Sequence, residues 1–397
     1  MIASYRRKFN GEFTHKKYEK LLENLAHNLP PISFRIAETP LFIPRELADK
    51  LVKAGDEIIQ FIKRPDFKDL TQRAIPDARN VPGENEHPHF LTFDFAICKN
   101  DSGALVPKLI ELQGFPSLYG FQSHLAEHYE KAYSLSQFGE LTPYFDQLDK
   151  TAYFNLLKAI IIGNYDPQEV VLLDLDAPNQ KTAIDFYLTQ KELGFKVMSP
   201  TDLIQEGKQL YYQEHGKKIQ IKRIYNRLIF DEICNPEAFF KQGFDPRVDM
   251  DLEWITHPNW FYRLSKYTMP FLKGDFVPET RFLKDVAVLP QDLENYVLKP
   301  LFSFAGQGVI IDVTPEDVHN VKDPENWILQ RKVKYEPVVQ ALDGGVKTEI
   351  RLMYLWADGA DPVLCINLAR MSRGKMIGVR YNKDFDWVGG TIGFLEK

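Results

Sequence analysis

The stretch with the clearest chemical potential is a lysine at the end of an apolar run, followed by a loop of small residues. Residues 296–299 read Tyr-Val-Leu-Lys, and Ser303, Ala305, Gly306 and Gly308 lie in the loop that follows. Backbone N–H groups without bulky side chains, together with the ammonium of Lys299, can enclose phosphate oxygens. For this stretch alone, a structural glycine hairpin is an equally good interpretation.

Two familiar nucleotide motifs are absent from the sequence. No GxxxxGK[ST] pattern occurs, and the small-residue loop leads into a strand pattern and not into a helix. A P-loop and a Rossmann dinucleotide site are therefore both unsupported.

Segments before and after this loop have further features that could contribute to a binding site. The apolar runs over residues 90–98 and 105–113, joined by Lys-Asn-Asp-Ser-Gly, predict a β-hairpin. The extended segment from Trp327 could offer backbone hydrogen bonds to an adenine edge. Glu349 and Arg351 are two apart on a predicted strand and so share one face. Residues 378–393 combine Arg380, Lys383 and several glycines, which predicts a second loop for phosphate or carboxylate.

In this order, the motifs resemble the circularly permuted branch of the ATP-grasp superfamily, as in eukaryotic-type glutathione synthetase and glutathionylspermidine synthase. In that branch a Glu-x-Asn metal motif precedes the nucleotide lysine, and residues 108–121 occupy its place. The resemblance implies Mg²⁺ ligands at Asp94, Glu111 and Gln113, oxygen donors of the kind that Mg²⁺ prefers. Gln113 stands where Asn is usual, and the glycine loop lacks the acidic residue that many relatives use as a further ligand.

The same resemblance implies a role for each remaining candidate residue. Lys299, Arg351 and Arg380 are expected to be catalytic, with Arg380 holding a substrate carboxylate. The expected nucleotide contacts are Lys266, Lys299, Ser303, Ala305, Gly306, Gly308, Gln330, Lys332, Val333, Glu349, Lys383, Gly389 and Gly390. From the residues themselves, Asn226 and Arg227 leave an apolar strand as a polar pair and are expected to contact substrate. The resemblance adds Ser117 and Arg380 to the expected substrate contacts.

The implied cofactors are ATP and Mg²⁺, and the implied reaction is ADP-forming ligation of a carboxylate to an amine through an acyl phosphate. The substrates would be small molecules or peptides. Two alternatives stay open: a degenerate ATP-grasp protein that binds nucleotide without turnover, and a small-molecule kinase that uses the same nucleotide site.

The elements that must position these residues indicate an α/β protein with N-terminal helices and an inserted α/β lobe. The resemblance implies that the rest forms a circularly permuted ATP-grasp core and that the inserted lobe binds substrate. Residues 1–90 carry helical periodicity, and residues 91–165 contain the predicted hairpin. Residues 166–260 contain a strand-helix-strand order typical of a parallel layer. Residues 261–397 are rich in strand patterns and are expected to form an antiparallel nucleotide-binding region and lid.

Several other residues have simpler interpretations. His124 and His128 are four apart on a predicted helix, but a third zinc ligand is not apparent. His87 and His89 suit a surface loop or the rim of a substrate site more than a metal site, and Asp174 suits a solvated strand end or a substrate contact. The aromatic residues Trp254, Trp260, Phe261 and Tyr262 are expected to pack in the core or between lobes.

Composition limits the function classes. The 397 residues include 49 Lys plus Arg against 55 Asp plus Glu, a net charge of −6, so no nucleic-acid partner is expected. The three cysteines, Cys98, Cys234 and Cys365, are far apart, and no signal or membrane segment is evident. We expect a cytoplasmic protein with no membrane partner; the oligomeric state stays open, a homodimer included.

Overall fold

The centre of the molecule is an antiparallel sheet built from early and late parts of the chain. The computed structural model describes residues 1–233, 244–302, 307–374, 382 and 385–396. The strand order is β19 (Gly389–Thr391), β18 (Val363–Ser372), β17 (Gly344–Leu355), β2 (Phe90–Lys99) and β3 (Leu105–Gln113), with β16 (Val339–Ala341) beside β17. The predicted hairpin is therefore present as β2 and β3, and β17 pairs with β2 across about 250 residues of sequence.

The two faces of this sheet differ because side chains alternate along each strand. Phe93 lies opposite Leu352 on one strand and Leu112 on the other, and all three are fully buried. Helix α3 (Arg45–Ile62) packs on this face, where Gly55 lets it approach Leu352 and Tyr354 closely. The opposite face carries charged residues.

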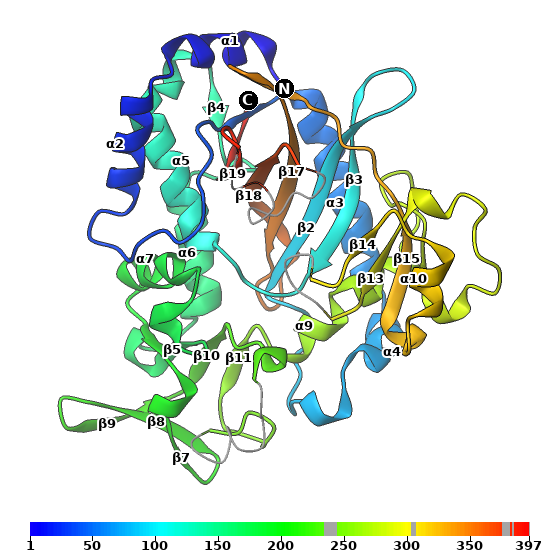
Figure 1. The fold of residues 1–397 in the computed structure, drawn as a ribbon. Helices are drawn as coiled ribbons and strands as arrows, with labels where there is room; N and C mark the ends of the chain where they lie inside the picture. Colours follow the sequence, from blue (N-terminus) through cyan, green and yellow to red (C-terminus); the bar gives the residue numbers. More distant parts are fainter. Residues whose placement is uncertain (234–243, 303–306, 375–381, 383–384, 397) are drawn as a thin grey trace.

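The N-terminal region is mostly helical but also contributes a strand. Helices α1 (Ala3–Glu12) and α2 (His15–Leu25) lie beside α5 (Tyr119–Tyr133), and α6 (Lys150–Ile161) follows. Strand β1 (Leu41–Ile43) runs parallel to β20 (Gly393–Glu396), which also pairs with β4 (Leu141–Thr142). Both ends of the chain therefore meet at one side of the central sheet (Figure 1).

The region expected to be a parallel α/β layer has that form. Its strand order is β11 (Glu253–Ile255), β10 (Arg223–Asn226), β5 (Val170–Leu173) and β6 (Lys196–Met198), all parallel. Helix α7 (Ala183–Leu193) connects β5 to β6. Strands β7 (Ile204–Glu206), β8 (Gln209–Glu214) and β9 (Lys217–Ile221) form a separate small sheet that projects from this lobe.

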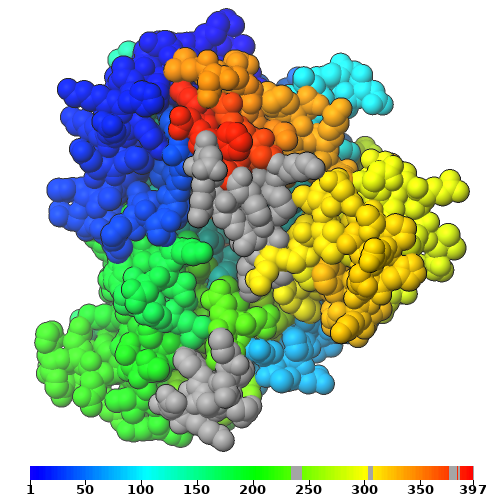
Figure 2. All heavy atoms as spheres, viewed as in Figure 1, coloured from blue at the N-terminus to red at the C-terminus, as the bar shows by residue number. Residues whose placement is uncertain are grey.

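The late part of the chain forms a second antiparallel sheet with its own small core. The order is β12 (Thr280–Phe282), β15 (Trp327–Arg331), β13 (Tyr296–Pro300) and β14 (Ile310–Ile311). Leu298 and Leu329 are among the buried residues of its core. Figure 2 shows this part, in yellow, as a lobe distinct from the green α/β lobe.

Three short helices lie outside these sheets: α4 (Phe67–Thr71), α9 (Asn259–Arg263) and α10 (Pro315–His319), with the 3₁₀ helix η8 (Lys266–Phe271) after α9. In the described ranges, no helix combines the length and apolar character needed to cross a membrane.

Candidate functional site

A row of charged residues crosses the central sheet on the face opposite helix α3. Asp94 of β2 lies directly opposite Glu111 of β3 on one side and Arg351 of β17 on the other. Glu349 of β17 lies opposite Arg370 of β18. Residues that face each other across antiparallel strands have side chains on the same face, so these five side chains come together.

The carboxylate of Asp94 is held by two arginines. Its Oδ1 accepts a hydrogen bond from Arg351 Nε at 2.5 Å, and its Oδ2 accepts from Arg351 Nη2 at 2.7 Å and from Arg370. Burial alone would raise the pKa of Asp94, but the two guanidiniums hold it below its ordinary value. Asp94 is therefore an ionised carboxylate with both oxygens occupied.

Arg370 and Tyr335 were not predicted from the sequence, yet both belong to this cluster. Arg370 donates to Asp94 and to Glu349, and the hydroxyl of Tyr335 donates to Glu349 Oε2 at 3.2 Å. The available signal for Arg370 was the alternation of the strand that begins at Val363, which puts residues 366, 368 and 370 on one face.

Strand β3 brings Glu111 next to two lysines from distant elements. A β-bulge at this point of the hairpin leaves Ile110 as an extra residue, and its carbonyl accepts a hydrogen bond from Lys299 Nζ at 3.2 Å. Lys266 of η8 lies with its Nζ 3.0 Å from Glu111 Oε1. Gly114 allows this arrangement, since a Cβ there would lie 2.7 Å from the carbonyl oxygen of Trp260 in α9 (Asn259–Arg263), the helix that precedes η8.

Lys299 is buried at the end of β13, where the sequence predicts a phosphate-binding lysine. Its Nζ also donates to Gln330 Oε1 of β15 at 2.6 Å. Burial, only partly offset by Glu111, lowers the pKa of Lys299 from 10.5 to about 8. The predicted residues Asp94, Glu111 and Lys299 thus lie in one cluster, although about 190 residues separate the hairpin from the lysine.

If Lys299 binds phosphate, as the sequence predicts, its lowered pKa implies that this binding weakens in mild alkali. The charged form of the lysine is lost as pH rises through about 8, so affinity for a phosphate ligand should fall by up to about tenfold per pH unit above that value. Calorimetric titration with ATP at pH 7 and pH 9 measures this. Lys299→Arg keeps its charge in this range and should show a flat profile; a flat profile in the wild type would contradict the assignment.

The other predicted nucleotide residues are spread around this lysine. Gln330 donates to Thr280 through its amide, while Lys332 forms an ion pair with Asp312 and also contacts the carbonyl of Glu294. Gly308 adopts a left-handed backbone conformation, with φ +71°. Val333 lies next to Lys332, just after the end of strand β15. The predicted residues Ser303, Ala305, Gly306, Arg380 and Lys383 lie outside the described residues.

Gly389 and Gly390, expected in a closing loop, lie in strand β19 and contact the N-terminal segment. Gly390 N donates to the carbonyl of Arg35 at 2.8 Å, and its own carbonyl accepts from Ala37 N at 2.9 Å. Gly389 has φ +123°, and a Cβ there would lie 2.5 Å from the Arg35 carbonyl oxygen. The contacts seen for both glycines are structural, and their proposed nucleotide role stays a prediction.

Gly389→Ala is therefore expected to destabilise the protein by about 1 to 3 kcal/mol, because the added methyl group meets backbone and not a movable side chain. Urea denaturation measures the change. Gly11→Ala is the matched control, since nothing lies within 4 Å of that site in helix α1. Unchanged stability of Gly389→Ala together with weaker ATP binding would contradict the structural role.

A second polar group lies in the α/β lobe, at the carboxyl ends of its parallel strands. Arg227 follows β10 and is buried, with its guanidinium 4.5 Å from the ring centre of Phe115. Its Nη2 lies 3.4 Å from Thr182 Oγ1, and its Nε lies 3.9 Å from Asp174. Within the described residues, Arg227 Nε and Nη1 are buried without a hydrogen-bond partner.

The loop that carries Ser117 connects the two polar groups. It follows Gln113 of β3, and Phe115 in it contacts Arg227. Asp185 of α7 accepts hydrogen bonds from Leu118 N at 3.1 Å and Phe121 N at 2.8 Å, which fixes the end of the loop. The side chain of Asn226, another predicted substrate contact, accepts from Leu228 N at 3.0 Å and so stabilises a local turn.

Burial raises the pKa of two carboxyl groups in this second polar group, Asp174 and Asp185. It raises the pKa of Asp174 to about 7, against the opposing effect of Arg227. It also raises the pKa of Asp185 to about 6. A buried arginine between Phe115 and Phe186, beside a carboxyl that titrates near neutrality, is suited to exchange partners with an incoming anionic ligand.

The histidine candidates take structural roles. His128 Nδ1 lies 2.8 Å from the carbonyl of His124, and His124 Nε2 lies 3.1 Å from the carbonyl of Leu25. Trp254, Trp260 and Tyr262 are buried, as expected for core residues, and Phe261 is partly buried against the core. Across the ranges that the structure describes, no group of three or more His, Cys, Asp or Glu side chains is arranged to hold a metal ion.

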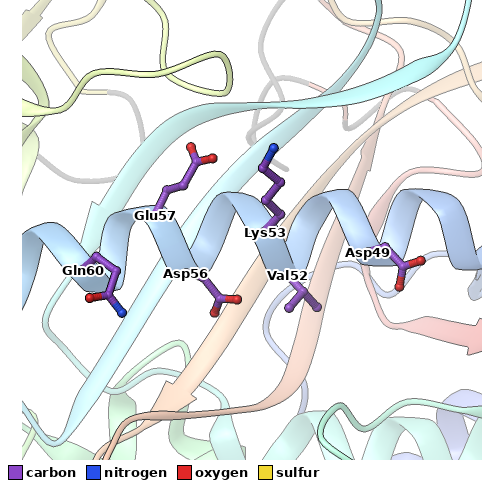
Figure 3. A pocket seen from close by; sticks show the side chains of 6 residues that line it. All are labelled: Asp49, Val52, Lys53, Asp56, Glu57 and Gln60. Atoms are coloured by element: carbon purple, nitrogen blue, oxygen red, sulfur yellow. The ribbon is translucent and has the colours of Figure 1, made fainter.

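A hollow on the outer side of helix α3 is lined by six residues of that one helix: Asp49, Val52, Lys53, Asp56, Glu57 and Gln60. Figure 3 shows Lys53 and Glu57 on one side of the helix and Asp56 and Gln60 on the other. With three carboxylates and one lysine, it does not suit a polyanion.

The fold can be compared with known proteins. No protein-family model matches the chain, and no similar sequence was found among curated proteins. Among solved structures, the fold is similar to that of a glutathione synthetase-like effector from Globodera pallida in its apo form. The two share 11% identity with a TM-score of 0.60, and the match covers 96% of each chain. The chain therefore has a mixed α/β fold similar to that of this glutathione synthetase-like effector.

Proposed function

We propose that this protein is an ATP-grasp-type ligase, circularly permuted as in glutathione synthetase, that activates a carboxylate with ATP and joins it to an amine. The observation that carries the proposal is the meeting of Lys299, Lys266 and Glu111 at one point between the central sheet and the β13 sheet. Two lysines from different elements at a buried position are suited to the phosphate chain of a nucleotide.

In the proposed reaction, a substrate carboxylate oxygen attacks the γ-phosphorus of ATP and the bond to ADP breaks. The resulting acyl phosphate reacts with an amine, which forms the amide, releases phosphate and loses a proton. Lys266 and Lys299 would neutralise the transferring phosphoryl group. Arg380 keeps its proposed role as a clamp for the substrate carboxylate.

The Mg²⁺ site implied by the family resemblance does not fit the described side chains. Both oxygens of Asp94 accept from guanidiniums, and Glu111 lies 3.0 Å from Lys266. Gln113, the third expected ligand, contributes no charge. Because both oxygens of Asp94 and one oxygen of Glu111 already have cationic partners, no step of the mechanism is assigned to a metal ion.

For the acid substrate, we propose that Arg227 binds an anionic group other than the reacting carboxylate, which is assigned to Arg380. Arg227→Met keeps the apolar contact with Phe115 but removes the charge, so it should raise KM for the acid by about tenfold or more. The affinity for ATP, measured by calorimetry, should change little. Equal losses of acid and ATP affinity would instead indicate that the variant disturbs the fold.

A second candidate is a nucleotide-binding protein without turnover. The pairing of Asp94 with both Arg351 and Arg370 favours it, because a carboxylate fixed in this way is not open to a catalytic cation. In this candidate, ATP binds at the same lysines but no acyl phosphate forms.

Two measurements separate these functions. A thermal-shift assay with ATP tests the nucleotide site: saturation at about a hundred times Kd should add about 2.7 kcal/mol of stability. ADP release that requires both an acid and an amine, with free phosphate as a product, supports the ligase. Nucleotide binding without ADP release over a wide panel of acids and amines supports the second candidate.

A further inference from the structure

The carboxylates of the central cluster already have cationic or hydroxyl partners. Asp94 is bonded to Arg351 and Arg370, and Glu349 accepts from Arg370 and Tyr335. Glu111 pairs with Lys266. A divalent cation held by Asp94 together with another carboxylate of this cluster would have to displace the arginines from Asp94 and would leave buried cations beside it.

The net charge of the described cluster also argues against a divalent cation. Its three carboxylates, Asp94, Glu111 and Glu349, face four cations: Lys266, Lys299, Arg351 and Arg370. The sum of three negative and four positive charges is +1. A protein site for Mg²⁺ usually supplies uncompensated carboxylate oxygens, so this cluster suits an anion and not a cation.

Lys299 is the residue that an anion bound in this cluster would contact. Within the part of the chain that the structure describes, its two hydrogen bonds go to neutral oxygens, the side-chain oxygen of Gln330 and the carbonyl of Ile110. The positive charge of Lys299 is stabilised by the nearby carboxylates of Glu111 and Glu349, neither of which is hydrogen-bonded to it. The ammonium of Lys266 destabilises that charge by repulsion. A phosphate oxygen in place of the Gln330 contact would give this buried ammonium a charged partner.

We propose that the site binds the polyphosphate chain of its nucleotide in the metal-free form, with the cationic side chains supplying the charge neutralisation that Mg²⁺ supplies elsewhere. The inference deepens the proposed function and rests on it for the nucleotide. The ligand class is a polyphosphate anion, free of a divalent cation, and Lys266 and Lys299 are its direct contacts.

Calorimetric titration of the full chain tests this with three ligands: ATP with EDTA, ATP with excess Mg²⁺, and inorganic tripolyphosphate with EDTA. We expect the Kd for ATP in EDTA to be equal to or lower than that with Mg²⁺, within about threefold. A Kd about tenfold or more higher in EDTA would overturn the inference but leave the proposed nucleotide site intact. No ATP binding in either condition would overturn both. Tripolyphosphate binding as tight as ATP would support the inference and identify the phosphate chain, and not the nucleoside, as the recognised part.

Glu111→Gln gives a second test, because the change in ATP affinity should have opposite signs if Glu111 repels phosphate and if it holds a metal ion. If Glu111 only repels phosphate and competes for Lys266, the variant should bind ATP about threefold more tightly with and without Mg²⁺, the size expected for one partly exposed charge. A selective loss of affinity in Mg²⁺ would mean that Glu111 holds the metal and would overturn the inference. Glu46→Gln, in the exposed pair with Lys50 on helix α3, is the matched control.

Discussion

Lys299→Ala should weaken ATP binding by about tenfold or more. The variant removes a buried ammonium that would contact phosphate, and a charge-assisted contact of this kind contributes about 1.5 to 3 kcal/mol. Because the ammonium is already desolvated in the free protein, little of this is spent on stripping water from it during binding. Calorimetry at pH 7 gives the change in Kd directly.

Lys53→Ala is the control for this prediction. Lys53 is an exposed lysine of helix α3 that lines the acidic hollow of Figure 3, on the face of the sheet away from the cluster. Its removal changes the net charge equally but should leave the ATP affinity unchanged. Similar losses in both variants would mean that ATP responds to overall charge, and the assignment of Lys299 would then be wrong.

Asp94→Asn should destabilise the fold by about 3 to 5 kcal/mol. The carboxylate is the shared partner of Arg351 and Arg370, and removing one member of a buried ion network leaves the others uncompensated. Urea denaturation followed by circular dichroism measures the loss. We expect no comparable loss for Glu46→Gln, which breaks an exposed ion pair on helix α3.

The double variant Asp94→Asn with Arg351→Gln refines this expectation. If the loss comes from an unpaired guanidinium, removing Arg351 as well should recover part of the stability, so the two changes should not add. A single variant as stable as the wild type would contradict the ion network as a support of the central sheet.

The sequence predicted the local elements well because their signals are local. The β2–β3 hairpin follows from two apolar runs around a turn-forming segment, and the parallel layer follows from a strand-helix-strand order. The grouping of Asp94, Glu111 and Lys299 came from motif order in a family resemblance, and the structure brings these residues together.

What the sequence did not predict depends on pairing between distant strands. Arg370 belongs to the cluster because β18 pairs with β17 in a register that sets it opposite Glu349, and no local pattern encodes that register. The commitment of Asp94 to two arginines follows from the same pairing. Likewise, Gly389 is close to Arg35 only because the two ends of the chain meet in space.

A crystal structure with a non-hydrolysable ATP analogue tests the central claim most directly. The account predicts phosphate oxygens within about 4 Å of both Lys266 Nζ and Lys299 Nζ, with the Lys299–Gln330 contact replaced. The claim would be contradicted by an analogue bound elsewhere, with Lys266 still paired with Glu111 and Lys299 still donating to Gln330.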